Sequence, residues 1–484
     1  MIGTESMSRK KKTAYLILTV VLWMLVWQVA AIIIDNRIFL PSPLDTLKSL
    51  GILLRMNEFY YSVCFSLGNI AKGFLLGIFG GTVLATVASR TEFLETFLSL
   101  PMRVIKAVPV ASFTILALFW VDSTELSVLI SFFMVLPIIY TNVLVGIKET
   151  DRKMLEMAQV FRISLGNKVR FLYAPSVLPY LFSASSVAIG LAWKSGIAAE
   201  VIGLTKASIG NYLYEAKIYL EMPTLFAWTC VIIVISILSE KIILLLLHEV
   251  ESKMRGTAED YEELQKTEGQ KEASDVAGDL PEKSSSVAPH DSSGIITLHD
   301  VSKAYGEKQV LSHVTLSISK DQPIALMGSS GIGKTTLLRI VLGTEKPDDG
   351  WVERKPEDTP ISVVFQENRL CETISVEQNL KMVCKNKKQK EEIEPILERM
   401  GLKHCKKQRV ASLSGGMKRR VAIGRALVYD APVLLLDEPF QGLDEHTKQT
   451  VLSFVKERMR GKSVLLVTHE KQEGMELECK IVQL

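Results

Sequence analysis

The chain has few cysteines, and their spacing excludes the common metal and redox motifs. Its 484 residues include six cysteines, none of which form a CxxC pair or a Cys/His cluster with metal spacing. They are Cys64, Cys230, Cys371, Cys384, Cys405 and Cys479. The last four lie in a part of the chain with a cytosolic character, where thiols stay reduced. We therefore expect all six to be structural.

The sequence also lacks a strong charge of either sign. The formal net charge is +3, which is too small to predict nucleic-acid binding. Apolar residues make up 48% of the chain, yet the charged fraction of 23% is near that of soluble proteins. Both values are possible because the long apolar runs are concentrated in residues 13–247. The length is too great for one core, so we expect a membrane part and a soluble part.

Six apolar segments approach the roughly 20 residues needed to cross ~30 Å of hydrocarbon. They cover about 14–34, 63–89, 104–121, 126–147, 177–202 and 223–247. Basic residues precede the first segment at 9–12 and are abundant between 148 and 170. The positive-inside rule then predicts a multi-pass protein of the cell membrane, with both termini in the cytoplasm.

A polar stretch separates the membrane part from the soluble part. Residues 251–294 lack apolar periodicity and are rich in Glu, Ser, Lys, Gly and Asp. Such a composition cannot bury enough apolar surface to offset the entropy of ordering, which predicts a flexible linker. The expected boundaries are therefore 1–250 for the membrane domain, 251–294 for the linker and 295–484 for the soluble domain.

The soluble domain contains a phosphate-binding loop in its expected context. "PIALMGSSGIGKTTLLRIVLG" (323–343) passes from an apolar strand through GxxxxGK[ST] into a predicted helix. The glycines let backbone N–H groups face phosphate, Lys334 would reach the β- and γ-phosphates, and Thr335 would ligate Mg²⁺. The predicted ATP-binding residues of this loop are Gly328, Ser329, Ser330, Gly331, Ile332, Gly333, Lys334, Thr335 and Thr336.

Two carboxylates follow a second apolar strand. "VLLLDEPF" (433–440) is typical of a strand buried on both faces of a parallel sheet. We expect Asp437 to hold the magnesium shell and Glu438 to act as the general base on the attacking water. A helix N-cap before Pro439 is the alternative, and the phosphate loop favours the catalytic role.

Further motifs resemble those of ATP-binding cassette (ABC) proteins across residues 296–484. "SLSGGMKRRVAIGRAL" resembles the signature motif, "VVFQEN" the glutamine loop, "VTHE" the switch-histidine segment and "GLD" the loop after the catalytic glutamate. The resemblance implies roles for Gln366 (catalysis and Mg²⁺), His469 (catalysis), Tyr305 (adenine stacking), and Ser414, Gly415, Gly416 and Asp444 (nucleotide binding). It also implies a homodimer in which each ATP is bound between two cassettes. Met417 replaces the usual glutamine of the signature, which should alter affinity but not abolish hydrolysis.

A basic amphipathic stretch lies between the fourth and fifth predicted spans. "EMAQVFRISLGNKVRFLYAPSVLP" (156–179) resembles the coupling loop of binding-protein-dependent importer permeases, with Glu156, Ala158 and Pro175 at matching positions. Arg162 occupies the family's glycine position. Met157, Val160, Phe161 and Leu165 fall on one face of a helix. We predict a coupling helix at about 156–175 that docks on the cassette; a basic helix on the inner leaflet is the alternative.

Other segments resemble permeases of the nitrate/sulfonate/taurine group. They are "FLPSP" (39–43), "AVPVASF" (107–113) and "AWKSGIAAEVIG" (192–203). The implied fold is an all-α, six-helix permease domain, similar to type I importers, joined to an α/β P-loop ATPase. Lys194 and Glu200 are candidates for the substrate path, because ionisable side chains inside spans are costly. Contact with a neighbouring helix, or snorkelling outward, remains the alternative for both.

The expected function is therefore an ATP-driven importer that contains its own ATPase. The resemblance implies that it takes small, anionic or heterocyclic solutes from a separate extracytoplasmic binding protein, a lipoprotein or a periplasmic protein, by alternating access. The implied cofactors are ATP and Mg²⁺, and the implied partners are a second copy of the chain and the lipid bilayer. An exporter, or a membrane-anchored ATPase that senses ligand occupancy, are the alternatives.

Overall fold

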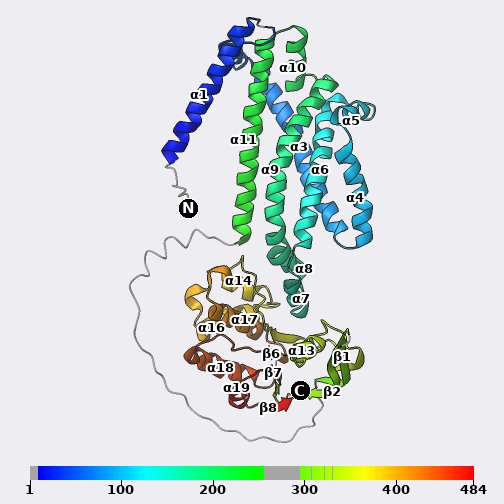
Figure 1. Cartoon of the computed structure of the whole chain (residues 1–484), viewed down its shortest axis with the longest axis vertical. Coiled ribbons are helices and arrows are strands. Elements are labelled where there is room, and N and C mark those ends of the chain that lie inside the picture. Colours follow the sequence, from blue (N-terminus) through cyan, green and yellow to red (C-terminus); the bar gives the residue numbers. More distant parts are fainter. Residues whose placement is uncertain (1–8, 37, 256–294, 307, 321, 330) are drawn as a thin grey trace. The chain divides into compact units, whose positions relative to one another are not determined.

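The computed structural model describes residues 9–36, 38–255, 295–306, 308–320, 322–329 and 331–484 (Figure 1). It divides into two compact units. The helical unit comprises Met1–Glu149 and Ser176–Val250, and the α/β unit comprises Thr150–Pro175 and Glu251–Leu484. A short segment between two apolar helices therefore belongs to the same unit as the ATPase motifs.

The helical unit contains the predicted spans. Five of its helices (α1, α3, α6, α9 and α11) are long and apolar enough to cross a bilayer among the described residues. A sixth crossing results if α4 and α5 are counted as one broken span. The helices are α1 (Arg9–Ile34), α2 (Pro43–Leu53), α3 (Asn57–Ala88), α4 (Glu92–Ala107), α5 (Val110–Ala117), α6 (Ser123–Lys148), α9 (Ala174–Gly203), α10 (Ile209–Ile218) and α11 (Met222–Arg255).

The third predicted span, 104–121, is not one straight helix. Helices α4 and α5 meet at an angle of 101°. The cause is Pro109, which caps the start of α5, while the preceding Val108 is extended (φ −73°, ψ 128°). A residue before proline is disfavoured in the helical region, so the helix ends there.

Helix α11 extends past the predicted start of the linker. It continues to Arg255, so residues 251–255 are helical. The remainder of the predicted linker, 256–294, lies outside the described residues.

Helices α3 and α6 pack closely because α3 presents glycines at intervals of four. These are Gly73, Gly77 and Gly81. A Cβ atom on Gly73 would lie 2.4 Å from the carbonyl oxygen of Val128, and one on Gly77 would lie 2.6 Å from Cγ1 of Val135. Small residues at this spacing allow helix backbones to approach in an apolar environment.

The α/β unit is built on two sheets. A three-stranded antiparallel sheet has the order β2-β1-β4, and a five-stranded parallel sheet has the order β5-β6-β7-β3-β8. Every residue of β5, β6 and β7 is buried, as expected for apolar strands covered on both faces. The strands are β1 (Ile296–Tyr305), β2 (Lys308–Ile318), β3 (Ile324–Met327), β4 (Asp349–Arg354), β5 (Ile361–Val364), β6 (Val433–Asp437), β7 (Ser463–Val467) and β8 (Lys480–Gln483).

Helices complete the α/β unit and confirm its predicted class. They are α7 (Arg152–Val160), α8 (Leu165–Lys168), α13 (Lys334–Leu342), α14 (Val376–Lys381), α15 (Lys387–Glu391), α16 (Ile393–Arg399), α17 (Gly415–Tyr429), α18 (Glu445–Met459) and α19 (Lys471–Glu476). The predicted coupling helix at 156–175 is divided: α7 and α8 are followed by a π-helical turn at Val169–Tyr173. Residues of this segment, such as Met157 and Phe161, share one hydrophobic core with the sheet strands.

The α3–α6 contact gives the first prediction. Gly77→Ala should lower the free energy of unfolding by about 1–3 kcal/mol, because the added methyl group overpacks against Val135. Thermal unfolding of the full chain in detergent would measure the change. Gly68→Ala is the matched control in the same helix, since nothing lies within 4 Å of its added Cβ. Equal midpoints for the two variants would contradict the packing role.

Candidate nucleotide-binding and coupling site

The loop between β3 and α13 depends on glycine for its conformation. Gly331 (φ +81°) and Gly333 (φ +114°) both lie in the left-handed region. A Cβ on Gly333 would also lie 2.8 Å from the carbonyl oxygen of Val310. The loop leads into the N-terminus of α13, whose N–H groups favour an anion. Ser330, predicted to belong to this site, lies outside the described residues.

The lysine of the loop is held inside it. Lys334 is 6% exposed, and its ammonium group donates hydrogen bonds to the carbonyl oxygens of Gly328 (2.7 Å) and Ser329 (2.9 Å). This places a positive charge within the loop, as binding of phosphate groups requires. The neighbouring Thr335 begins the same helix.

The end of β6 brings the two predicted carboxylates next to a histidine. Glu438 has φ +48°, and its N–H donates to the carbonyl oxygen of Val467 at 2.8 Å. Nε2 of His469 lies 2.9 Å from Oε1 of Glu438. No helix begins at residues 438–440 in this described stretch; α18 begins at Glu445, so the N-cap alternative for the acidic pair is wrong.

The first carboxylate of the pair lies in a low-dielectric environment. Burial, reinforced by the negative charge of Glu438, raises the pKa of Asp437 to about 6. The positive charges of Arg419 and Lys334 oppose this shift. At neutral pH the carboxylate is therefore still ionised, which a cation-binding role needs.

Three predicted magnesium ligands line one small cavity of about 100 Å³. They are Thr335, Gln366 and Asp437. A hydroxyl, an amide oxygen and a carboxylate are the hard oxygen donors that Mg²⁺ prefers. The residues present therefore fit the cation that the sequence implies.

The predicted adenine-stacking residue lies at the end of β1. The ring of Tyr305 is about half exposed, and its hydroxyl group donates to the carboxylate of Glu345. The ammonium group of Lys303 lies 5.7 Å from the ring centroid. The phenol is thus fixed at its tip while part of the ring surface remains accessible.

The signature residues lie at the start of α17. The hydroxyl of Ser414 caps this helix and accepts the N–H of Met417 at 3.3 Å. The side chain of Met417 packs against the core of the α/β unit, and a Cβ on Gly416 would lie 3.3 Å from the carbonyl oxygen of Gly442. Asp444 caps α18 by accepting the N–H of Thr447 at 3.0 Å, a bond that lowers the pKa of the Asp444 carboxyl group.

One buried arginine, which the motif analysis did not single out, connects these elements. Arg419 is 3% exposed, and its guanidinium group donates six hydrogen bonds. The acceptors are the carbonyl oxygens of Phe365, Gln366, Asp437, Glu438 and Pro439 and the side-chain oxygen of Asn368. Burial lowers the pKa of Arg419 to about 10, so it stays charged at neutral pH. It fixes the glutamine loop to the end of β6.

The segment that follows α6 inserts its apolar face into the α/β unit. Met157, Ala158 and Phe161 are fully buried, and Val160 is half-buried. The ring of Phe161 meets Tyr429 edge to face, with centroids 5.1 Å apart. Leu165, predicted for the same face, is 80% exposed. That prediction was wrong because α7 ends before it.

The end of α7 explains the glycine of the related permeases. Arg162 has φ +49°. Its N–H donates to the carbonyl oxygen of Gln159 at 3.0 Å, and the N–H of Ile163 donates to the carbonyl oxygen of Ala158 at 2.9 Å. This is the Schellman helix ending, in which glycine is usual at the left-handed position. Here an arginine adopts the conformation.

Polar contacts place the same segment beside the glutamine loop. The carboxylate of Glu156 pairs with Arg369 at 3.0 Å, and Lys153 pairs with Glu367 at 2.7 Å. The thiol of Cys371 donates to the carbonyl oxygen of Phe171 at 3.1 Å. Glu367, Arg369 and Cys371 all lie within five residues of Gln366 in the sequence.

The two candidate path residues have different environments. Glu200 is fully buried; its Oε2 accepts the hydroxyl of Ser66 at 2.8 Å and the N–H of Gly210 at 3.1 Å. This carboxylate joins α9 to α3 and α10, which favours an anchoring role over substrate contact. Lys194 is exposed and stays a candidate for the path.

Comparison with known proteins adds independent information. Residues 311–441 match the family model described as "ABC transporter", and residues 73–252 match "Binding-protein-dependent transport system inner membrane component". The chain is 35% identical over 204 residues to the thiamine import ATP-binding protein ThiQ of Brucella suis (39% of this chain, 84% of that protein). It is 36% identical over 203 residues to the aliphatic sulfonates import ATP-binding protein SsuB 1 of Pseudomonas aeruginosa (39% and 82%). It is 35% identical over 207 residues to the spermidine/putrescine import ATP-binding protein PotA of Bacteroides fragilis, of which it spans 45%, with 40% of this chain covered.

The contacts of Arg419 give the second prediction. Arg419→Met should leave buried carbonyl oxygens without a donor, costing about 3 kcal/mol of stability and lowering ATP turnover by about tenfold or more. Chemical denaturation and phosphate release would measure the two effects. Lys418→Met is the matched control, because Lys418 makes a surface pair with Glu372 (2.7 Å) of the kind that contributes little. Wild-type turnover in the Arg419 variant would refute the tethering role.

Proposed function

The chain belongs to the ABC transporter family, and we propose that it is an ATP-driven importer whose permease and ATPase are fused in one polypeptide. In this proposal two copies form the transporter in the cell membrane, with the ATPase domains in the cytoplasm. A separate extracytoplasmic binding protein supplies the solute.

One observation carries the proposal: the segment Thr150–Pro175 is part of the core of the α/β unit. Along the chain this segment connects α6 to α9, two apolar helices of the helical unit. A movement of the nucleotide-binding unit must therefore act directly on the ends of these helices. Docking through Phe161 supports coupled transport over a basic helix lying on lipid.

The residues around the phosphate loop have roles that their geometry supports. Lys334 would bind the β- and γ-phosphates, and Thr335, Gln366 and Asp437 would hold Mg²⁺, whose charge would stabilise the phosphate oxygens. Glu438 accepts a proton from the attacking water. The Nε2–H of His469 donates to its carboxylate and holds it in position.

A homodimer accounts for the place of the signature residues. In the described part of the chain, Ser414–Gly416 make no hydrogen bond to the loop at 328–335. Each cassette would offer these residues to nucleotide held on its partner, giving two composite sites. Asp444 and Tyr305 complete the predicted nucleotide contacts.

The permease motifs and two of the named relatives support a class of solute. The proteins named above import thiamine, aliphatic sulfonates, and spermidine or putrescine. We infer a small solute, heterocyclic or anionic, accepted by alternating access. Accumulation of binding-protein-delivered solute inside proteoliposomes, with ATP on the cassette side, tests import. Efflux instead would favour an exporter, and hydrolysis without movement of solute would favour a sensor.

The assignment of the general base gives the third prediction. Glu438→Gln should retain ATP binding but lower turnover by about 10²–10⁴-fold, because the amide cannot accept the proton. Nucleotide binding and phosphate release by the full chain would be measured together. The control is Glu445→Gln, an exposed carboxylate that accepts a hydrogen bond from Gln449 of its own helix. Near-normal turnover by the Glu438 variant would refute the assignment.

The docked segment gives the fourth prediction. Phe161→Ala removes a buried ring, at a cost of about 3–5 kcal/mol to the docking contact. Solute uptake should fall by about tenfold or more, while ATP hydrolysis by the cassettes should stay within about twofold. The control is Leu165→Ala in the same segment, where the side chain is exposed. Equal loss of uptake and hydrolysis would indicate general damage and contradict a specific coupling role.

A further inference from the structure

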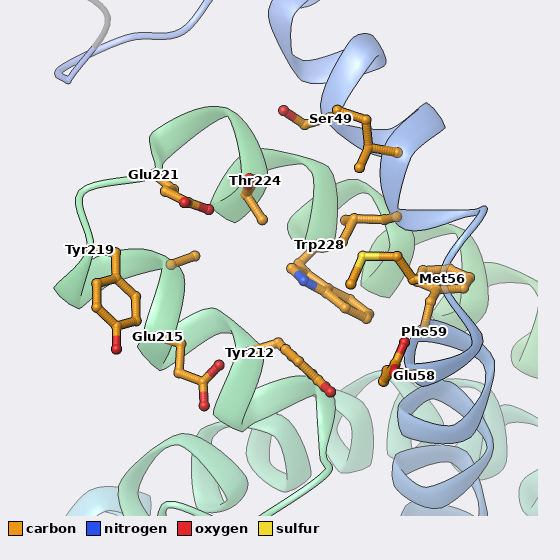
Figure 2. A pocket seen from close by; sticks show the side chains of 13 residues that line it. Ser49, Met56, Glu58, Phe59, Tyr212, Glu215, Tyr219, Glu221, Thr224 and Trp228 are labelled. Carbon is orange, nitrogen blue, oxygen red and sulfur yellow. The ribbon is translucent and has the colours of Figure 1, made fainter.

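The helical unit contains a cavity of about 240 Å³ at one end of two of its apolar helices, α3 and α11 (Figure 2). It is enclosed by α2, the start of α3, α10 and the start of α11. Its lining residues are Ser49, Ile52, Leu53, Met56, Glu58, Phe59, Tyr212, Glu215, Ala216, Tyr219, Glu221, Thr224 and Trp228. The volume suits a molecule with a single ring.

Aromatic rings form one wall of this cavity. The ring of Trp228 is 1% exposed and stacks with Tyr212, at a centroid distance of 5.4 Å and an interplanar angle of 15°. Phe59 also packs against the indole, with centroids 5.1 Å apart and an interplanar angle of 30°. Trp228 therefore supports Tyr212 and Phe59 from within the unit, and the accessible aromatic surface comes from the partly exposed ring of Tyr212 and from Tyr219, which is 74% exposed. Tyr219 lies across the cavity from Trp228 (Figure 2).

The cavity lining carries three glutamates and no basic residue. Glu58, Glu215 and Glu221 line the cavity together with no lysine or arginine. Figure 2 shows Tyr212 between Glu58 on one side and Glu215 on the other. Burial, then the charges of Glu215 and Glu58, raise the pKa of the Tyr212 phenol. Among the described residues, these carboxylates form no ion pair.

The chemistry of this lining distinguishes between ligand classes. A cation over the face of a tyrosine ring is attracted by the ring quadrupole, and nearby carboxylates add to that attraction. An anion would be repelled by three negative charges. A neutral ring would gain only from burial. The bond from the Asn211 amide to Glu215 (2.7 Å) orients that carboxylate without neutralising it.

We propose that this cavity binds a small, flat organic cation, such as a pyridinium-type or other positively charged heterocycle. The identification of this cation as the imported solute rests on the proposed function, and it favours the heterocyclic class over the anionic class. The binding itself requires only the residues of the helical unit.

The test compares two probes of the same shape and different charge. The 1-methylnicotinamide cation and neutral 3-methylbenzamide would be titrated calorimetrically into the full chain in lipid nanodiscs without ATP. We expect the cation to bind at least about tenfold more tightly. Anionic 4-toluenesulfonate should bind more weakly than both. Equal affinities for cation and neutral probe, or tighter binding of the sulfonate, would overturn the proposal.

Substitutions of lining residues test whether the cation binds in this cavity. Glu215→Gln with Glu221→Gln should weaken binding of the cation by at least about fivefold and leave the neutral probe unaffected. Glu125→Gln, an exposed carboxylate of the same unit outside the cavity, is the control. Trp228→Leu should weaken the cation further, with Trp120→Leu, which is 76% exposed, as its control. Unchanged binding in the glutamine double variant would overturn the proposal without depending on the buried tryptophan.

The same measurements separate this inference from the proposed function. Cation binding without ATP-driven accumulation of any solute in proteoliposomes would refute import and leave the cavity assignment intact. Accumulation without cation binding would refute the cavity assignment alone.

Discussion

The buried guanidinium groups of α17 are the interaction on which the nucleotide-binding unit depends. Arg419 holds the backbone at 365–366 against that at 437–439, and Arg425 donates to the carbonyl oxygens of Asn368 and Arg369. The guanidinium group of Arg425 also lies 5.3 Å from the centroid of the Phe161 ring. One helix thus fixes both ends of the glutamine loop and contacts the coupling segment. The end of β6, the glutamine loop and Phe161 therefore all contact side chains of the same helix.

The helical unit is held together by a different kind of force. Its central contact, between α3 and α6, depends on the absence of side chains at glycine positions, because an apolar environment offers little hydrophobic driving force between helices. Its buried carboxyl group, Glu200, accepts a hydroxyl and a backbone N–H at one of its two oxygens. Close backbone contact and local hydrogen bonding therefore hold this unit together.

The sequence was sufficient for features that depend on local pattern. The apolar runs predicted the helices, and the phosphate loop and the DE pair predicted where the nucleotide-binding residues converge. Features set by tertiary contacts were not accessible: the six acceptors of Arg419 come from two separate segments, 365–368 and 437–439, and the contacts of buried Glu200 come from Ser66 and Gly210. The end of α7 removed Leu165 from the predicted apolar face, since periodicity cannot show where a helix stops.

The left-handed Arg162 has a mechanical consequence. A glycine keeps such a bend at little cost whether or not the neighbouring surface is present, whereas a residue with a Cβ is penalised by roughly 1–2 kcal/mol. In this chain the bend is accompanied by burial of the adjoining Ile163, which is 6% exposed, and by the two hydrogen bonds that end α7. We expect the bend to be conditional: if the cassette released Ile163, the arginine would relax toward the right-handed region and α7 would lengthen. The end of α7 would then have two stable conformations, whereas a relative with glycine at this position would keep the bend in both states.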